Sequence, residues 1–129
     1  MITIKTVKPA ELDTAKDFIR EVFPDAMVQV ADDDLLLLAE EDGRAIGFAH
    51  IIEFDDRVVL QGIGVDSSIR GQGVGTLLLE QVLSMFEDAD RSIYLKVKAM
   101  NPAIDLYARY GFFLKKFGDA HVLVKKPNS

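Results

Sequence analysis

The chain has 129 residues, of which 49% are hydrophobic and 28% charged, and this is typical of one folded domain over residues 1–129. It contains no cysteine, so disulfides, thiolate metal sites and a cysteine acyl-enzyme are excluded, and we assign no metal site. With a net charge of −6, the chain lacks the basic surface of a nucleic-acid-binding protein. The negative charge favours cationic partners, amines among them.

The first half of the chain predicts a strand, a helix and a meander of three strands. Ile2–Val7 alternates as a strand does, and Pro9–Val22 carries apolar residues at three- and four-residue spacing, which indicates a helix. Phe23–Asp34 is predicted to be irregular. The meander strands are predicted at Leu35–Glu40, Ala45–Phe54 and Val58–Val65, with an Asp-Gly turn between the first two.

After a glycine-rich loop, the second half predicts a helix, a strand, a helix and a terminal hairpin. The helices are expected from Val74 to about Asp88 and from Asn101 to Gly111, and the strands at Ser92–Val97, Phe112–Phe117 and Ala120–Val124. The order of elements predicts an α/β fold in the broad sense (α+β). Its sheet is mixed, mostly antiparallel and of about seven strands, with helices flanking it.

Five of the nine glycines lie between Gly62 and Gly75, and three of them sit in the loop before a helix. A strand followed by a glycine loop and a helix N-terminus can bind an anion such as phosphate. A nucleotide-binding P-loop is excluded because Gly75 is followed by Thr76 and not by lysine. The dinucleotide-binding motif G-x-G-x-x-G is also excluded, because it requires a third glycine at the position of Thr76.

The segment Arg70–Gly75, RGQGVG, resembles the R/Q-x-x-G-x-G/A loop of the GNAT family of N-acetyltransferases. The later segment Asn101–Phe112 resembles the family motif N-x-x-A-x-x-L-Y-x-x-x-G-F, with the alanine shifted to Ala103. Ser67 departs from the proline that many members carry. The resemblance implies the acyl-CoA N-acyltransferase fold and acetyl-CoA as cosubstrate. It is loose over Ile2–Asp34, where the family has a longer two-helix region.

The resemblance implies a cosubstrate site built largely from backbone. Arg70 would pair with a phosphate, and the pyrophosphate would accept hydrogen bonds from the amides of Gly71, Gln72, Gly73, Val74, Gly75 and Thr76. The strand before the loop would separate from its neighbour to admit the pantetheine arm, and a backbone N–H near Ile63, Gly64 and Val65 would polarise the thioester carbonyl. Glycines in this strand also fit a bulge. Asn101 suits a helix cap, a contact to the pantetheine arm, or both.

Tyr107 aligns with the family tyrosine that protonates the departing thiolate of coenzyme A. A phenol, with a reference pKa of about 10, is protonated at neutral pH and can donate that proton. The alternative is a core aromatic on one helix face, which is our interpretation of Tyr110.

The sequence offers one candidate base, Glu53, at the end of its strand. Lys96 stands where relatives that act on protein N-termini often carry a glutamate, and the amide of Gln61 cannot serve as a base. We interpret His50 as a core or surface residue and Asp32–Asp34 as a solvated loop.

The opening residues resemble no targeting signal, and the longest apolar runs are too short to span a bilayer, so we expect a cytoplasmic protein with no membrane partner. The leading hypothesis is direct transfer of acetyl from acetyl-CoA to a primary amine of a small molecule. One alternative is a protein lysine or N-terminal acetyltransferase, and another is a non-catalytic acyl-CoA-binding module. An open groove would favour a protein acceptor, and a closed acidic pocket would favour a small polyamine-like one. A homodimer is left open.

Overall fold

The computed structural model describes residues 1–22, 30–69, 71–98 (backbone only at 98), 101, 103–116, 118 and 120–127. The strands are β1 (Ile2–Thr6), β2 (Leu35–Glu41), β3 (Arg44–Glu53), β4 (Arg57–Val65), β5 (Ser92–Lys98), β6 (Phe113–Lys116) and β7 (Ala120–Lys125). The helices are α1 (Leu12–Val22), α2 (Val74–Met85) and α3 (Ala103–Arg109), with short 3-10 turns η1 (Pro9–Glu11) and η2 (Ser67–Ile69). The predicted elements are thus confirmed to within a few residues.

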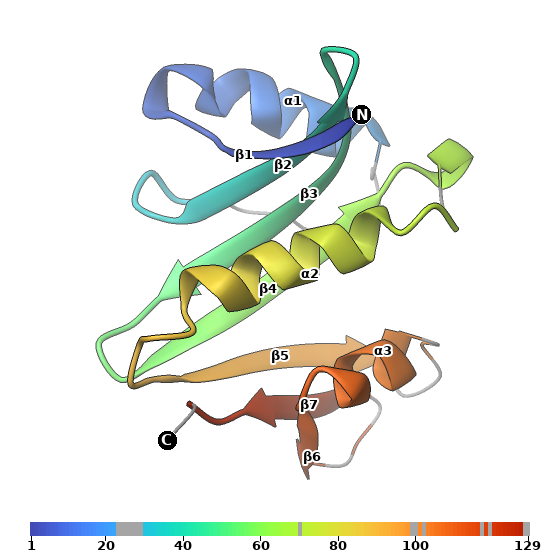
Figure 1. The fold of residues 1–129 in the computed structure, drawn as a ribbon. Helices are drawn as coiled ribbons and strands as arrows, with labels where there is room; N and C mark the ends of the chain where they lie inside the picture. Colours follow the sequence, from blue (N-terminus) through green and yellow to red (C-terminus); the bar gives the residue numbers. More distant parts are fainter. Residues whose placement is uncertain are drawn as a thin grey trace.

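The strands form one mixed sheet in the order β1-β2-β3-β4-β5-β7-β6 (Figure 1). Every neighbouring pair is antiparallel except β4 and β5, which run parallel. A parallel pair needs a long crossover, and α2 provides it. The β2–β3 turn has positive φ at both Asp42 (53°) and Gly43 (78°), which is the hairpin geometry that an Asp-Gly pair favours.

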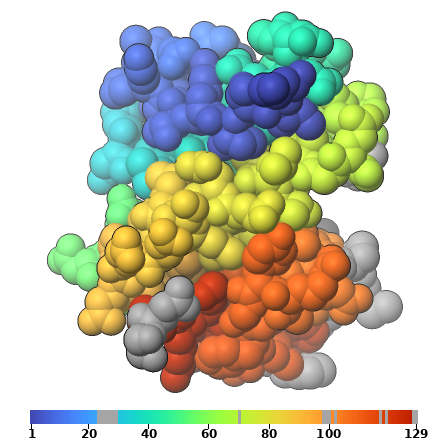
Figure 2. Space-filling model, viewed as in Figure 1, coloured from blue at the N-terminus to red at the C-terminus, as the bar shows by residue number. Residues whose placement is uncertain are grey.

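Helices α2 and α3 cover the same face of the sheet. Buried residues of α2 pack with the centres of the strands, and α3 adds partly buried side chains to the same cluster. The space-filling view shows α2, in yellow, between the N-terminal part of the chain and α3, in orange (Figure 2). Among the described helices, none is long and apolar enough to cross a membrane.

Helix α1 covers only part of the opposite face. Ala15 and Ile19 of α1 pack against Leu36, Leu38 and Phe48, which belong to β2 and β3. Within the described ranges, no helix packs on β4, β5 and β7 from this side. The two faces of the sheet therefore differ, and the uncovered part lies opposite α2.

Gly47 marks the closest approach of β3, β4 and α2. A β-carbon there would lie 2.9 Å from the carbonyl oxygen of Gly64, and 3.3 Å from side-chain carbons of both Val74 and Leu78. We expect Gly47→Ala to lower the free energy of unfolding by about 1–3 kcal/mol, because the backbone of β4 must move to accept the methyl group. Chemical denaturation measures this difference.

Gly62→Ala is the matched control for Gly47→Ala. A β-carbon at Gly62 would have one neighbour within 4 Å, a ring carbon of Phe48 at 3.8 Å, which is an ordinary contact. Its stability should stay within about 1 kcal/mol of the parent protein. Equal destabilisation by the two substitutions would show that Gly47 is not a packing constraint.

Candidate active site

The glycine loop has two glycines in the left-handed region, Gly71 with φ 88° and Gly73 with φ 81°. A β-carbon at either position would have no neighbour within 4 Å, so backbone conformation and not crowding favours glycine there. Gly75 differs, because its φ is not positive and a β-carbon would make an ordinary 3.7 Å contact with Val65. The three glycines therefore do not share one structural reason.

The N-terminus of α2 presents amide groups that no side chain among the described residues caps. Gly73 is the residue that caps this helix, with no side-chain hydrogen bond, and the first turn contains no acidic residue. The first N–H groups of a helix lack partners within the helix, so those of Val74, Gly75 and Thr76 can donate to an anion. Val74 is buried and fixes the start of the helix on the core, while Gln72 is exposed. Arg70 lies outside the described residues.

Strands β4 and β5 stop pairing halfway along their length. Their parallel register begins at Arg57↔Ser92 and ends at Leu60↔Leu95. Beyond that point β4 continues on β3, and β5 continues on β7. Figure 1 shows the two strands diverging toward the end of the sheet where α3 lies.

The register also places a bulge at the point of divergence. His50 pairs with Gly62 and Ile51 with Leu60, so Gln61 has no residue opposite it. A bulge and a separation of strands are therefore both present. Residues Ile63, Gly64 and Val65 lie on the diverging part of β4, beyond its last pair with β5. In a ladder, alternate residues direct their N–H and C=O groups to opposite sides, and Asp66 donates to Ile46 of β3, so Ile63 directs its N–H to the side away from β3.

Asn101 caps α3. Its Oδ1 accepts a hydrogen bond from the N–H of Ala103 at 2.9 Å, and its backbone oxygen accepts one from Ile104 at 3.2 Å. The capping prediction is confirmed. The side chain is exposed, and its Nδ2 donors are not used by the cap, so a contact to the pantetheine arm stays a prediction.

Tyr107 is held at the C-terminal end of α3. Its backbone oxygen accepts hydrogen bonds from Tyr110 and Phe112 as the chain leaves the helix through Gly111, which has φ 95°. The Tyr107 ring meets that of Phe112 edge to face at 5.8 Å and packs on the α2-side core. This burial raises the pKa of the Tyr107 phenol, so the group holds its proton throughout the neutral range.

The structure does not bring Glu53 together with these groups. Glu53 pairs with Val58, and its Oε1 accepts a hydrogen bond from Arg91 at 3.0 Å. From Val58 to Ile63, β4 advances roughly 17 Å at about 3.3 Å per residue, so Glu53 lies at the far end of the sheet. Arg91 also donates to the Phe54 carbonyl, so the position favours a role in holding the β3–β4 turn.

His50 and Asp34 form a buried pair. His50 Nε2 lies 2.8 Å from Asp34 Oδ2, and the two side chains are 2% and 9% exposed. The same oxygen accepts the N–H of Ala31 at 2.9 Å. The expectation of a solvated loop holds for Asp32 and Asp33, which are exposed, and is wrong for Asp34.

The hairpin register explains the pair. Leu36 is opposite His50, and Asp34 is two residues before Leu36, on the same face of the extended chain. A bulge between Ala39 and Glu40 shifts this register by one residue from the register that the Asp-Gly turn alone would set, so the turn does not by itself place the carboxylate beside the imidazole. The pair joins the segment before β2 to the sheet.

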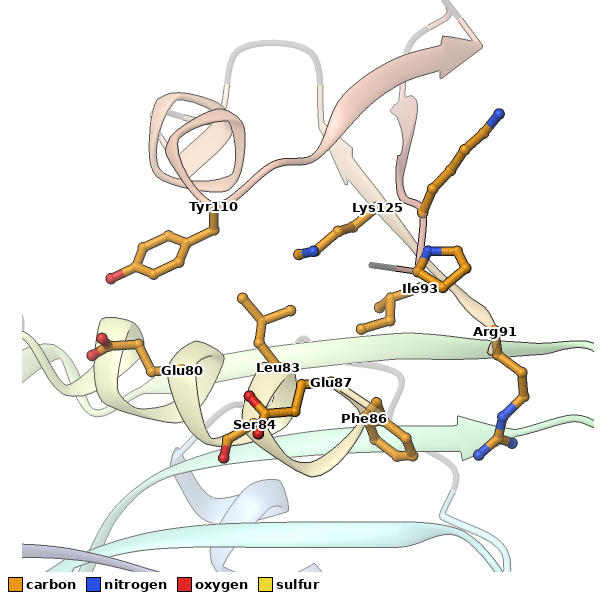
Figure 3. A pocket seen from close by; sticks show the side chains of 11 residues that line it. Glu80, Leu83, Ser84, Phe86, Glu87, Arg91, Ile93, Tyr110 and Lys125 are labelled. Carbon is orange, nitrogen blue, oxygen red and sulfur yellow. The ribbon is translucent and has the colours of Figure 1, made fainter. Parts of the chain in front are cut away.

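A cavity of about 260 Å³ lies between the C-terminal half of α2 and the end of β7 (Figure 3). Glu80 of α2 and Glu87, which follows the helix, lie across it from Lys125 and the ring of Tyr110. Ser84 lies roughly 15 Å along α2 from Val74, ten residues at about 1.5 Å each. This cavity is therefore remote from the glycine loop, and we do not count it in the candidate active site.

A second cavity, of about 310 Å³, lies where β4 and β5 diverge. Its lining residues are Arg57, Val59, Leu60, Gln61, Tyr94, Leu95, Lys96 and Val122. It thus includes the last paired residues of both strands and the first residues beyond them.

A family model described as the acetyltransferase (GNAT) family matches residues 7–112. The chain belongs to the GNAT family. It is therefore an acetyl-CoA-dependent acetyltransferase, and the match includes both the glycine loop and Tyr107. No match was found among curated proteins.

Solved structures share the fold of this GNAT chain at low sequence identity. The ribosomal-protein-S18-alanine N-acetyltransferase from Escherichia coli is 22% identical with a TM-score of 0.81, covering 100% of this chain and 96% of its own. The PaiA N-acetyltransferase from Thermoplasma acidophilum, in complex with coenzyme A, is 17% identical with a TM-score of 0.77, at 98% and 99% coverage. Arabidopsis thaliana Naa50, in complex with a bisubstrate analogue, is 22% identical with a TM-score of 0.77, at 97% and 98% coverage.

Proposed function

We propose that this protein transfers an acetyl group from acetyl-CoA directly to a primary amine of a small molecule. The observation that supports acetyl transfer is the gathering of three features at one end of the sheet, and the net charge of −6 favours an amine as acceptor. The glycine loop precedes α2 there, β4 and β5 diverge beyond Leu60 and Leu95, and α3, which contains Tyr107, lies at the same end.

The chain's own groups suit the parts of acetyl-CoA. The amides from Gly71 to Thr76 would donate to the pyrophosphate at the helix N-terminus. The part of β4 beyond its last pair with β5, at Ile63–Val65, would run beside the pantetheine arm, and a backbone N–H there would polarise the carbonyl of the thioester. The Nδ2 of Asn101 would contribute a further donor. The bound cosubstrate supplies the activated acetyl group.

The reaction balances without a covalent enzyme intermediate. The amine nitrogen forms a bond to the acetyl carbon, the carbon–sulfur bond breaks, and the sulfur leaves with the electron pair. The Tyr107 phenol would give its proton to that sulfur, while the amine loses a proton to solvent or to a base that we leave unassigned. A two-step route through an acylated cysteine is excluded because the chain has no cysteine.

A polypeptide amine is the second candidate acceptor, and one observation favours it. In the described part of the chain, no helix covers β4, β5 and β7 on the face opposite α2. The described residues that line the cavity on that face include Arg57 and Lys96 and no acidic residue. The closed acidic pocket expected for a polyamine-like acceptor is therefore not formed by these residues.

Acetyl-CoA should raise the melting temperature of the protein at micromolar concentrations. A ligand at a hundred times its Kd adds about 2.7 kcal/mol of stability, which corresponds to a shift of several degrees in a domain of this size. Coenzyme A itself should act similarly, because most proposed contacts are to the pyrophosphate and pantetheine. Absence of a shift with either compound at millimolar concentration would contradict the proposed site.

A further inference from the structure

The side chains of β5 alternate between the two faces of the sheet. Ile93, Leu95 and Val97 are buried in the core beneath α2. Tyr94 and Lys96 therefore project from the opposite face, which no helix covers within the described ranges. Lys96 is exposed, and it is the first residue of β5 beyond the last pair with β4.

The cavity at this point has a positive wall. Arg57 and Lys96 line it together with the neutral polar side chains of Gln61 and Tyr94, and no acidic residue is among its described lining. A third cation lies at its edge, because Lys115 Nζ donates to Tyr94 Oη at 3.1 Å and lies 4.8 Å from the centre of that ring. The charge around this cavity is positive, whereas the net charge of the whole chain is −6.

The three cations differ in the contacts that they already make. Arg57 donates to Asp56 at 3.0 Å and stacks on the Phe54 ring at 4.4 Å, and Lys115 is directed to Tyr94. Lys96 forms no ion pair with any described residue. A ligand in this cavity can therefore bind Lys96 while breaking the fewest existing contacts.

We propose that the acceptor of the acetyl group carries an anionic group, a carboxylate or a phosphate, close to its reacting amine, and that Lys96 binds this group. The proposal rests on the proposed acetyltransferase function and specifies the chemistry of its acceptor. An anion at Lys96 would lie beside the point where β4 and β5 diverge, so the amine of the same molecule could reach the thioester from the uncovered face. Net charge alone favours the opposite acceptor, a polycation.

The test compares matched acceptors in an assay that follows release of the coenzyme A thiol. One pair is 4-aminobutyrate and its amide, a second is phosphoethanolamine and ethanolamine, and a third is the peptides Ala-Asp-Ala and Ala-Asn-Ala with amidated ends. We expect kcat/KM to be about tenfold or more higher for the anionic member of at least one pair, through KM. The pairs separate carboxylate from phosphate and small molecule from peptide.

Lys96→Gln should reduce that preference to about one, and Lys96→Glu should reverse it. Exposed substitutions of this kind rarely unfold a protein, and an unchanged melting-temperature shift with acetyl-CoA confirms an intact cosubstrate site. Lys126→Glu makes the same change of charge in the lining of the remote 260 Å³ cavity and should leave the preference intact.

Equal or better turnover of the neutral acceptors, or an anionic preference that persists in Lys96→Glu, would overturn the inference and leave acetyl transfer standing. If acetyl-CoA binds but no amine releases its thiol, the proposed function itself is wrong, and this inference falls with it.

Discussion

Replacing Tyr107 by phenylalanine should lower kcat by about a hundredfold or more, while the Kd for acetyl-CoA changes by less than about threefold. The expected loss follows from removing the proton donor, since the leaving thiolate must then take its proton from water. Binding should survive because the phenylalanine ring can keep the edge-to-face contact with Phe112 and the packing on the core. Steady-state kinetics and calorimetric titration with acetyl-CoA measure the two effects separately.

The direction of the Tyr107 pKa adds a pH criterion. Burial raises this pKa above its ordinary value of about 10, so the phenol keeps its proton across the neutral and mildly alkaline range. Loss of the proton should therefore not reduce kcat at any pH below about 10. A fall in kcat near pH 8 that disappears in Tyr107→Phe would contradict the assignment.

Tyr110→Phe is the matched control for Tyr107→Phe. Tyr110 lies three residues later and lines the remote cavity of Figure 3. Its substitution should leave kcat and the Kd for acetyl-CoA unchanged. If both variants lose activity equally, or if Tyr107→Phe loses cosubstrate binding and turnover together, Tyr107 is a structural residue.

Gly73→Ala should weaken acetyl-CoA binding by about tenfold to a hundredfold. Gly73 has φ 81°, and an L-residue in that region costs about 1–2 kcal/mol. Rearrangement of the loop in the alanine variant would relieve this backbone strain. Rearrangement would misdirect the amides that begin α2, and each charge-assisted hydrogen bond is worth about 1.5–3 kcal/mol. Calorimetric titration with acetyl-CoA measures the change in Kd.

Gly43→Ala controls for backbone strain alone. Gly43 has a similar φ of 78°, and a β-carbon there would also have no neighbour within 4 Å, but it lies in the β2–β3 turn. Its stability should fall by an amount similar to that of Gly73→Ala, with no change in Kd. A Gly73→Ala variant with parental affinity would remove the loop from the cosubstrate site.

Much of the site could be predicted because its signals are local. The left-handed glycines and the asparagine cap each depend on a few neighbouring residues, and backbone geometry limits which residues suit them. Asn101 forms the cap and Gly111 the left-handed helix end that their sequence context predicts, and Gly71 and Gly73 of the predicted loop are left-handed.

The remaining features depend on contacts between distant segments. The constraint on Gly47 arises from the approach of Gly64 and α2, and the burial of Asp34 depends on its register with His50. Glu53 has a residue type suited to a base, but its end of the strand and its pairing with Arg91 are set by the assembled sheet. Spacing along the chain carries none of this information.

Thiol release measured together with the mass of the acceptor shows whether a bound acetyl group passes directly to an amine. The protein is incubated with acetyl-CoA and a panel of primary amines, thiol release is followed, and the mass of each amine is measured by mass spectrometry. We predict that at least one amine becomes one acetyl group heavier, with one thiol released per acetyl transferred and a rate that falls in Tyr107→Phe. Thiol release that does not depend on the amine, or amines that stay unmodified while acetyl-CoA is bound, would contradict the claim.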